Sequence, residues 1–246
     1  MVIVYKEIYK CIAIYLIENA CAWARSRVHQ MKIYTLQDGE ELVKAARSSI
    51  ELHLKSPHFN RGIIKDALKG FTDKYGVFVT LTHYPTDTLR GCIGFLNGAY
   101  PMSEAVVEAA IAAATEDPRF VPVSHYELDE LLIEVSILSN EIPLGKTALS
   151  RERGIKIGRD GLIIRYGFYS GLLLPEVAVE EKFSKREFLA AVCEKAGLPS
   201  TYWMQQNVKM YRFETQIFKE EEPNGRVKEL DYSSMGSAKK SGKAHE

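Results

Sequence analysis

Apolar residues recur at helical spacing in four stretches of the chain: residues 1–30, 38–56, 102–116 and 184–197. Asp38 is the expected N-cap of the second stretch, and Pro57 ends it. Ser184 and Glu187 form a capping box at the start of the fourth stretch. The sequence therefore predicts four amphipathic or buried helices. Ser124 and Glu127 form a further capping box, which predicts a short helical turn.

Runs rich in β-branched, aromatic and alternating apolar residues predict strands between these helices. The runs cover residues 76–82, 89–96, 131–138, 161–166, 170–174 and 208–218. Residues 140–153 are polar and irregular, which favours a loop or a crossover. Because the strands come in hairpins, with helices between groups of them, we expect an α+β protein with a mainly antiparallel sheet and packed helices. One body with two lobes is compatible with this pattern.

The balance of charge limits the partners. The chain of 246 residues has 32 basic and 32 acidic residues, so no overall basic field draws it to nucleic acid or to an anionic membrane. The apolar run from Cys11 to Ile17 is far shorter than the roughly 20 residues that span a bilayer. We expect neither nucleic acid nor a membrane as a partner.

Cysteine and histidine usage point to the cytoplasm and to no bound metal. Four scattered cysteines do not form a secreted disulfide framework, and no Cys-x-x-Cys pair suggests zinc. The exception left open is an intracellular disulfide of a thermophile, Cys11 with Cys21 or Cys92 with Cys193. The six histidines are dispersed, and no nucleotide-binding glycine motif is present, so we expect no cofactor.

Both ends of the chain differ in pattern from its middle. Residues 1–30 read as an N-terminal amphipathic helical extension, which packs on the body or forms a contact between copies of the chain. Met31 would make an equally natural start. Residues 223–246 are charged, small and aperiodic, which predicts a polar C-terminal tail. Residues 31–222 are expected to form the domain itself.

Arginine, cysteine and glycine occur together in the predicted strand at residues 89–94, Leu-Arg-Gly-Cys-Ile-Gly. Side chains alternate along a strand, so Arg90 and Cys92 are expected on one face. Gly91 and Gly94 allow another group to approach the backbone closely. If that face lines a cleft, Arg90 is a donor for a carboxylate or a phosphate. Otherwise it pairs with an internal acid such as Glu116 or Asp117.

Cys92 and the corner at Pro118 each have two interpretations. Cys92 is either a nucleophile, activated by a nearby cation, or a small buried side chain on a central strand. No histidine is placed as its base, which favours burial. Asp117 and Arg119 flank Pro118 and suit an ordered corner as well as a binding site.

The strand motif and five further segments resemble the AMMECR domain family, named after the Alport syndrome, midface hypoplasia and elliptocytosis chromosomal region. The segments are residues 117–120, 135–139, 161–164, 172–175 and 193–198, in the family's order. The resemblance covers roughly residues 35 to 220. It implies two unequal lobes with the six-residue motif near a cleft between them. It also implies a shared pathway with Memo-like and radical-SAM proteins, through domain fusions, but no settled activity.

One residue departs from the family pattern, and two hypotheses follow. Glu176 stands where the family usually has glutamine, which adds a charge among the candidate ligand-binding residues. The first hypothesis is an enzyme that binds a small molecule or a peptide at a cleft built on Arg90, Cys92, Asp117 and Arg119. The second is a non-catalytic interaction domain in which the motif is structural.

Overall fold

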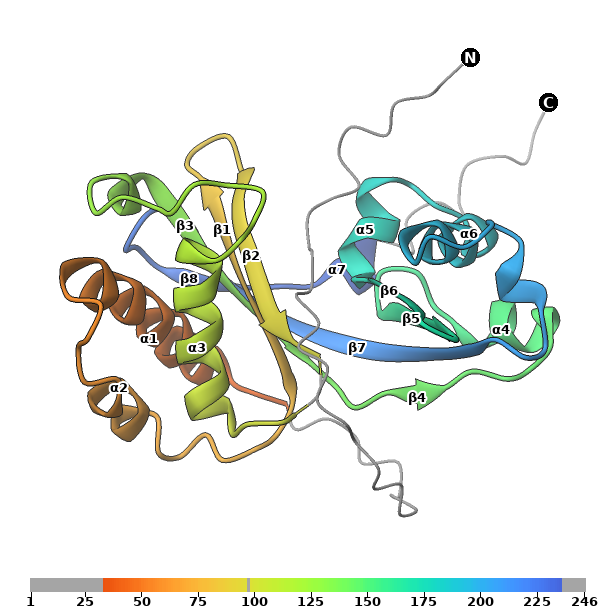
Figure 1. The fold of residues 1–246 in the computed structure, drawn as a ribbon, viewed down its shortest axis with the longest axis horizontal. Helices are drawn as coiled ribbons and strands as arrows, with labels where there is room; N and C mark the ends of the chain where they lie inside the picture. The colour runs from red at the N-terminus through yellow and green to blue at the C-terminus, as the bar shows by residue number, and fades with distance from the viewer. Residues whose placement is uncertain (1–32, 97, 236–246) are drawn as a thin grey trace. The chain divides into compact units, whose positions relative to one another are not determined.

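The computed structural model describes residues 33–96 and 98–235, which form two compact units of unequal size. Unit 1 contains residues 33–138 and 216–230, and unit 2 contains residues 139–215 and 231–235. Both units combine helices with antiparallel strands (Figure 1). The predicted α+β class is therefore confirmed, while the cleft between the lobes stays a prediction.

Unit 1 is a sheet with three helices. The helices are α1 (Leu36–Lys55), α2 (Gly62–Ala67) and α3 (Met102–Thr115), and a 3₁₀ turn, η1 (Glu127–Glu130), precedes the third strand. The strands are β1 (Gly76–His83), β2 (Thr88–Phe95), β3 (Leu131–Leu138), β8 (Val227–Leu230) and the last five residues of β7 (Lys209–Glu220). Every strand predicted in this unit is present within two residues of its expected ends.

Helix α1 begins three residues earlier than its sequence pattern suggested. Thr35, not Asp38, is the N-cap, and its side chain accepts a hydrogen bond from the Asp38 amide. Asp38 occupies the N3 position, where its carboxylate accepts from the Thr35 amide at 2.7 Å. Aspartate can replace the usual glutamate of a capping box because its carboxylate still reaches back to the N-cap. The predicted N-cap was wrong for this reason.

Strand β2 is the edge of the unit 1 sheet among the described strands, in the order β2-β1-β3-β7, with β8 on β7. Its pairing with β1 contains a bulge. Leu81 lies opposite Gly91, but Thr82 lies opposite Leu89, so Arg90 is an extra residue in β2. A bulge redirects the side chain of its extra residue and interrupts strict alternation.

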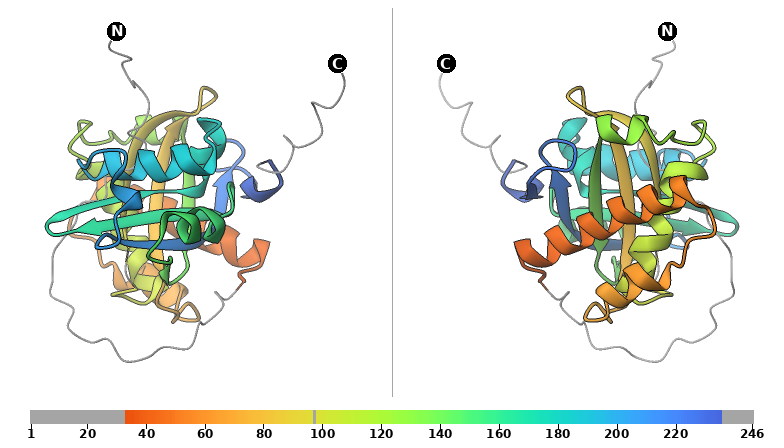
Figure 2. Two further views of the ribbon diagram at one scale, coloured as in Figure 1. Left: turned by 90° about the vertical axis from the view of Figure 1, so that its right-hand side faces the viewer. Right: turned by 90° about the vertical axis from the view of Figure 1, so that its left-hand side faces the viewer.

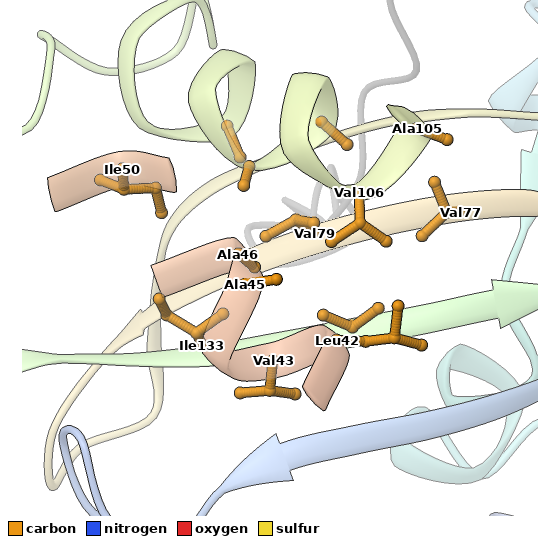
Figure 3. Close-up of a cluster of buried hydrophobic side chains, with 14 of the residues drawn as sticks. Leu42, Val43, Ala45, Ala46, Ile50, Val77, Val79, Ala105, Val106 and Ile133 are labelled. Atoms are coloured by element: carbon orange, nitrogen blue, oxygen red, sulfur yellow. The ribbon is translucent and has the colours of Figure 1, made fainter. Parts of the chain in front are cut away.

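Helices α1, α2 and α3 lie on one face of this sheet (Figures 1 and 2). Figure 3 shows the apolar side chains of α1 and α3 directed at Val77 and Val79 of β1 and at Ile133 of β3. The apolar residues of β1 in this core are Val77, Val79 and Leu81. Phe78, Thr80 and Thr82 alternate with them and therefore belong to the opposite face.

Unit 2 has short strands and helices around its own apolar core. Its strands are β4 (Ile142–Pro143), β5 (Asp160–Tyr166), β6 (Tyr169–Leu173) and the first part of β7; its helical segments are α4 (Ala148–Gly154), α5 (Pro175–Glu180), α6 (Lys185–Lys195), η2 (Tyr202–Met204) and α7 (Tyr232–Met235). The Ser184 capping box of α6 is confirmed. Its core centres on Phe188, Leu189 and Val192 of α6.

Seven elements lie where the sequence predicted none, and α2, α5 and η2 are three of them. Residues 140–153 contain β4 and α4, and the segment assigned to the tail contains β8 and α7. Helix α4 was missed because its capping box pairs Thr147 with Ser150, and serine at N3 is not the usual signature. Strand β8 is short and polar, and pairing with β7 defines it.

The Arg151 side chain fixes the backbone of residues 203–208 in unit 2. Its side chain is 1% exposed and donates to four backbone carbonyls, those of Gly145, Trp203, Gln205 and Val208. Burial lowers the pKa of Arg151 from its ordinary value. The guanidinium thus satisfies carbonyl groups of a segment that has little regular structure.

Candidate functional site

Asp117 covers the exposed edge of β2 at Cys92. Its Oδ2 accepts a hydrogen bond from the Cys92 amide at 2.9 Å. Unpaired amides on an edge strand invite pairing with another chain, and a carboxylate that accepts one of them removes this hazard. Asp117, which follows α3 in the chain, therefore ties the residues after this helix to the strand motif.

Arg119 holds the Asp117 carboxylate in place. Its Nε donates to Oδ1 at 2.9 Å, and its Nη2 donates to Oδ2 at 2.6 Å. Burial acts to raise the pKa of Asp117, but the hydrogen bonds from Arg119 and from the Cys92 amide lower it below its usual value. The predicted ordered corner at Pro118 exists, and its charges are paired with each other.

Arg90 pairs with Glu127 and not with either acid that the sequence suggested. Its Nε and Nη2 donate to the two carboxylate oxygens of Glu127, the second at 3.1 Å, and Nη2 also donates to the Val121 carbonyl at 2.9 Å. The bulge explains the difference, because Arg90 does not follow the alternation on which the prediction of a shared face with Cys92 depended. Arg90 fixes the segment 117–127 on β2.

Gly91 and Gly94 are required by close packing. A Cβ atom on Gly91 would lie 2.2 Å from the Ala113 carbonyl oxygen of α3. A Cβ atom on Gly94 would lie 2.2 Å from the Val77 carbonyl oxygen and 2.5 Å from the Phe78 ring. The first glycine lets α3 approach the edge strand, and the second makes room for an aromatic ring on the opposite face.

The Cys92 thiol lies in a row of polar side chains on the sheet face opposite the helices. Thr80 faces Cys92 across one strand pair and Glu134 across the other. The Thr80 hydroxyl donates to Cys92 Sγ at 3.3 Å. Lys219 of β7 extends the row, with its Nζ 3.7 Å from Glu134 Oε2 and in an ion pair with Asp87.

Thr82, two residues from Thr80 on the same strand and face, has a buried hydroxyl. The residue is 6% exposed, and its Oγ1 has no hydrogen-bond partner among the described residues. A buried hydroxyl of this kind costs free energy unless another group satisfies it. The polar face therefore has an unfilled hydrogen-bonding position.

Sequence reasoning missed the polar members of this row. Thr80, Glu134 and Lys219 each alternate with apolar residues of the helix-covered core: Val79, Ile133 and Phe218. Polar side chains at every second position normally mark a solvated face, so the pattern alone drew no attention. What sets this face apart is the burial of Thr82 and Lys219. Burial becomes visible only in the fold, so the sequence carried no signal for these residues.

The two cysteines of the described residues, Cys92 and Cys193, are both 0% exposed. Cys193 of α6 is fully buried in unit 2, and burial raises the pKa of its thiol to about 11. Cys92 and Cys193 are both free, so the disulfide between them that the sequence left open is not formed. Cys11, Cys21 and the whole N-terminal extension lie outside the described residues.

The last predicted ligand-binding residue, Glu176, lies apart from the others in the chain's division into units. Glu176 lies in the first turn of α5 in unit 2, whereas the other six candidate residues belong to unit 1. In the part of the chain that the structure describes, no group of three or more metal-ligating side chains comes together. No helix in this part has the length and apolar character needed to cross a bilayer.

Comparison with known proteins gives consistent matches over most of the chain. A sequence model of the AMMECR1 family matches residues 43–218. An uncharacterised protein of Thermococcus gammatolerans is 48% identical over 204 residues, which are 80% of this chain and 98% of the relative. The protein MJ0810 of Methanocaldococcus jannaschii is 49% identical over 199 residues, or 80% and 97% of the two chains.

A solved structure agrees with the fold. The crystal structure of the uncharacterized protein PH0010 from Pyrococcus horikoshii has a TM-score of 0.73 and 46% sequence identity. The match covers 78% of this chain and 96% of that chain.

Proposed function

This chain belongs to the AMMECR1 family, and we propose that it is an enzyme that binds a small molecule or a peptide beside Cys92, with the Cys92 thiol as nucleophile. The observation that carries the proposal is the row of Cys92, Thr80 and Glu134 on the sheet face opposite the helices. Polar groups within hydrogen-bond reach of a thiol, such as the Thr80 hydroxyl, are one requirement of a nucleophilic site. The Cys92 side chain is 0% exposed, so the proposal also requires this face to open when a substrate binds.

The two faces of the unit 1 sheet differ in a way that supports this assignment. The helix-covered face of β1 and β3 is apolar, with valine, leucine and isoleucine at each position. The opposite face of the same two strands is mixed: it carries Thr80, Thr82, Glu134 and Ser136 beside the apolar Phe78, Leu132 and Leu138. Buried polar groups contribute less to stability than apolar ones do, so their presence here favours a functional role. The unfilled Thr82 hydroxyl supplies a contact for a polar atom of the substrate.

The predicted ligand residues take supporting roles in this proposal. Arg90, Asp117 and Arg119 hold the segment 117–127 against the edge of β2, and Gly91 and Gly94 set the position of that strand. They fix the backbone on both sides of Cys92. Glu176 belongs to unit 2 and stays a separate candidate ligand contact, at a position where the family usually has glutamine.

Thiol labelling tests the proposal. Folded protein is treated with iodoacetamide, and the modified fraction of the peptides that contain Cys92 and Cys193 is followed by mass spectrometry. We expect Cys92 to be alkylated in the folded state and Cys193 to remain unmodified below about pH 9, because only a thiolate reacts readily. Modification of Cys92 only under unfolding conditions would contradict the proposal. The Cys92→Ser variant is the control, because an adduct on Cys92 is absent from it.

A non-catalytic interaction domain is the second candidate function, and one observation favours it. The segment fixed by Arg90 presents two large apolar side chains to solvent, Val121 (78% exposed) and Tyr126 (88% exposed). A rigid segment with exposed apolar side chains is suited to binding a protein partner. Under this alternative, Val121→Ser with Tyr126→Ser abolishes partner binding, while Cys92→Ser leaves it intact.

The cellular compartment and the pathway in this proposal are inferred from the sequence and from the family resemblance. The dispersed cysteines favour the cytoplasm. The resemblance supports a modification pathway shared with Memo-like and radical-SAM proteins. Contact between copies of the chain through residues 1–30 is part of the same proposal.

A further inference from the structure

Three of the large apolar side chains that unit 1 exposes lie at one end of it. They are Tyr84 (47% exposed) in the turn between β1 and β2, and Val121 and Tyr126 in the segment between α3 and β3. The Tyr84 amide donates to the Glu130 carbonyl at 2.9 Å, so the turn and the segment are in contact. Figure 1 shows both at the same end of unit 1. We call residues 83–87 and 116–130 the acidic end, for the charges described below.

The backbone of the acidic end is held in place before any partner binds. Arg90 donates to the Val121 carbonyl at 2.9 Å. Ser124 and Glu127 form the predicted capping box, in which each amide donates to the other side chain at 3.3 Å. A surface that is already ordered loses little conformational entropy on binding, which favours affinity. Val121 and Tyr126 are therefore presented on a fixed backbone.

The carboxylates of the acidic end outnumber its cations. Three of them are paired with cations: Asp117 with Arg119, Glu127 with Arg90, and Asp87 with Lys219. Three more, Glu116, Asp129 and Glu130, are exposed and form no ion pair with any described residue. The exposed apolar side chains thus lie in a surface with unbalanced negative charge.

Unit 1 as a whole is acidic, although the chain is neutral. Its residues 33–138 and 216–230 include 19 acidic and 12 basic side chains. Residues 139–215 and 231–235 of unit 2 include 10 acidic and 12 basic side chains. The zero net charge of the chain therefore hides opposite charges on its two units. An acidic surface accelerates association with basic partners and disfavours acidic ones.

We propose that the acidic end binds a segment of a partner protein that carries both basic and apolar side chains. This inference rests on the second candidate function, whose partner it defines chemically, and it does not depend on Cys92. The apolar side chains of the segment cover Val121 and Tyr126, and its cations lie beside Asp129 and Glu130. A small cation would leave the apolar side chains exposed, so a protein segment fits this surface better.

Peptide binding to the full chain tests the inference. The probe is a fluorescent peptide of alternating arginine and leucine, and anisotropy measures its Kd. Two control peptides carry glutamine or glutamate in place of arginine. We expect the arginine peptide to bind at least about tenfold more tightly than the glutamine peptide, and the glutamate peptide not to bind. The affinity of the arginine peptide should fall as salt is added, because salt screens exposed charges.

Two double variants locate the binding surface. Val121→Ser with Tyr126→Ser is expected to raise the Kd of the arginine peptide about tenfold, because exposed aromatic and aliphatic anchors dominate such interfaces. Asp129→Asn with Glu130→Gln is expected to raise it about fivefold. All four side chains are exposed, so both variants are expected to fold.

Matched variants elsewhere in unit 1 separate this surface from the general charge of the unit. Glu40→Gln with Glu41→Gln removes two exposed carboxylates from α1, and Ile63→Ser removes an exposed apolar side chain from α2. Each is expected to leave the Kd within about twofold of wild type. An equal effect of these variants and of those at the acidic end would overturn the inference, because only the overall field would then attract the peptide.

The remaining outcomes distinguish the partner's chemistry from the interaction function itself. Equal binding of the arginine and glutamine peptides, lost in Val121→Ser with Tyr126→Ser, would overturn the basic partner and leave an interaction domain in place. Absence of binding by all three peptides would overturn both. Cys92→Ser is expected to bind the arginine peptide as wild type does, so thiol labelling tests the first candidate function separately.

Two other occupants of the acidic end would each overturn the inference. Sedimentation equilibrium detects a second copy: self-association of wild type that is lost in Val121→Ser with Tyr126→Ser would assign the surface to it. Arg25→Gln with Arg27→Gln removes charge from the chain's own basic N-terminal sequence. Tighter binding of the arginine peptide to this variant would assign the surface to that sequence, and unchanged binding supports an external partner.

Discussion

At the scale of single residues, the strand motif combines positions with different physical duties. Arg90 and the two glycines establish geometry, whereas Cys92 carries the reactive group. The guanidinium of Arg90 is engaged on both sides by Glu127 and by the Val121 carbonyl. The Nε and Nη2 groups of Arg90 are therefore committed to this segment. The candidate chemistry therefore rests on the thiol and on the row beside it.

Substitution of Gly91 tests its packing role. Gly91→Ala is expected to reduce the free energy of unfolding by about 1–3 kcal/mol, because its methyl group would meet the Ala113 carbonyl of α3. Gly70→Ala is the matched control, since a Cβ at Gly70 has nothing within 4 Å. Its effect is expected within about 0.5 kcal/mol of zero. Urea unfolding measures both, and equal effects would refute the packing role.

At the scale of elements, the edge strand β2 and the segment 117–127 stabilise each other. Asp117 accepts from the strand backbone, and Arg90 donates to the segment backbone and to Glu127. Both guanidiniums lie near the Phe120 ring, whose centroid is 5.6 Å from Cζ of Arg90 and 5.3 Å from Cζ of Arg119. The segment is thereby ordered without regular secondary structure.

Loss of Arg90 should loosen this segment and change its response to acid. Hydrogen bonds from Arg90 lower the pKa of Glu127, so the pair stabilises the fold above the ordinary glutamate pKa, and this stabilisation is lost as pH falls through the lowered value. Arg90→Met is expected to cost about 2 kcal/mol near pH 7. The deficit relative to wild type should shrink as pH falls below the ordinary glutamate pKa and through the lowered pKa of Glu127.

Urea unfolding across this pH range measures the effect, and hydrogen exchange of residues 118–123 locates it. Arg186→Met removes an exposed guanidinium, 74% accessible, that pairs with Glu152 in unit 2, and it serves as the control. Its cost is expected below about 1 kcal/mol. A deficit of Arg90→Met that stays constant down to pH 3 would show that the ion pair with Glu127 is not its cause.

At the scale of the whole molecule, unit 1 is assembled from segments far apart in the chain. Arg47 of α1 donates to both carboxylate oxygens of Glu220 at the end of β7, and its Nη1 and Nη2 donate to the carbonyls of Leu128 and Leu131. Near the start of α1, Tyr34 and Gln216 exchange two hydrogen bonds. These contacts join the first helix of the unit to the strand that returns from unit 2.

Breaking the buried pair should destabilise unit 1 strongly. Arg47→Met leaves Glu220, whose side chain is 3% exposed, without its cation, and is expected to cost about 3–5 kcal/mol. Arg226→Met is the control, because the Arg226 side chain is 90% exposed. Its effect should be near zero. Replacing Glu220 by methionine as well should recover part of the loss, because no buried charge is then left unpaired. Thermal and urea unfolding measure all three variants.

The sequence by itself determined those features that depend on neighbours along the chain. The predicted strands and the helices at 102–116 and 184–197 are present because side-chain periodicity and capping boxes report local geometry. The α+β class followed from their order, and the family from its short motifs. The sequence missed only short elements, whose local signals are weak: α2, β4, α4, α5, η2, β8 and α7.

Only the tertiary structure decided which residues act together at the strand motif. The bulge at Arg90 depends on pairing with β1, and the partner of Arg90 lies 37 positions away, at Glu127. The row of Cys92, Thr80, Glu134 and Lys219 depends on strand order and register across four strands. Strand register and burial are set by contacts between distant segments, and no periodicity along one chain records them.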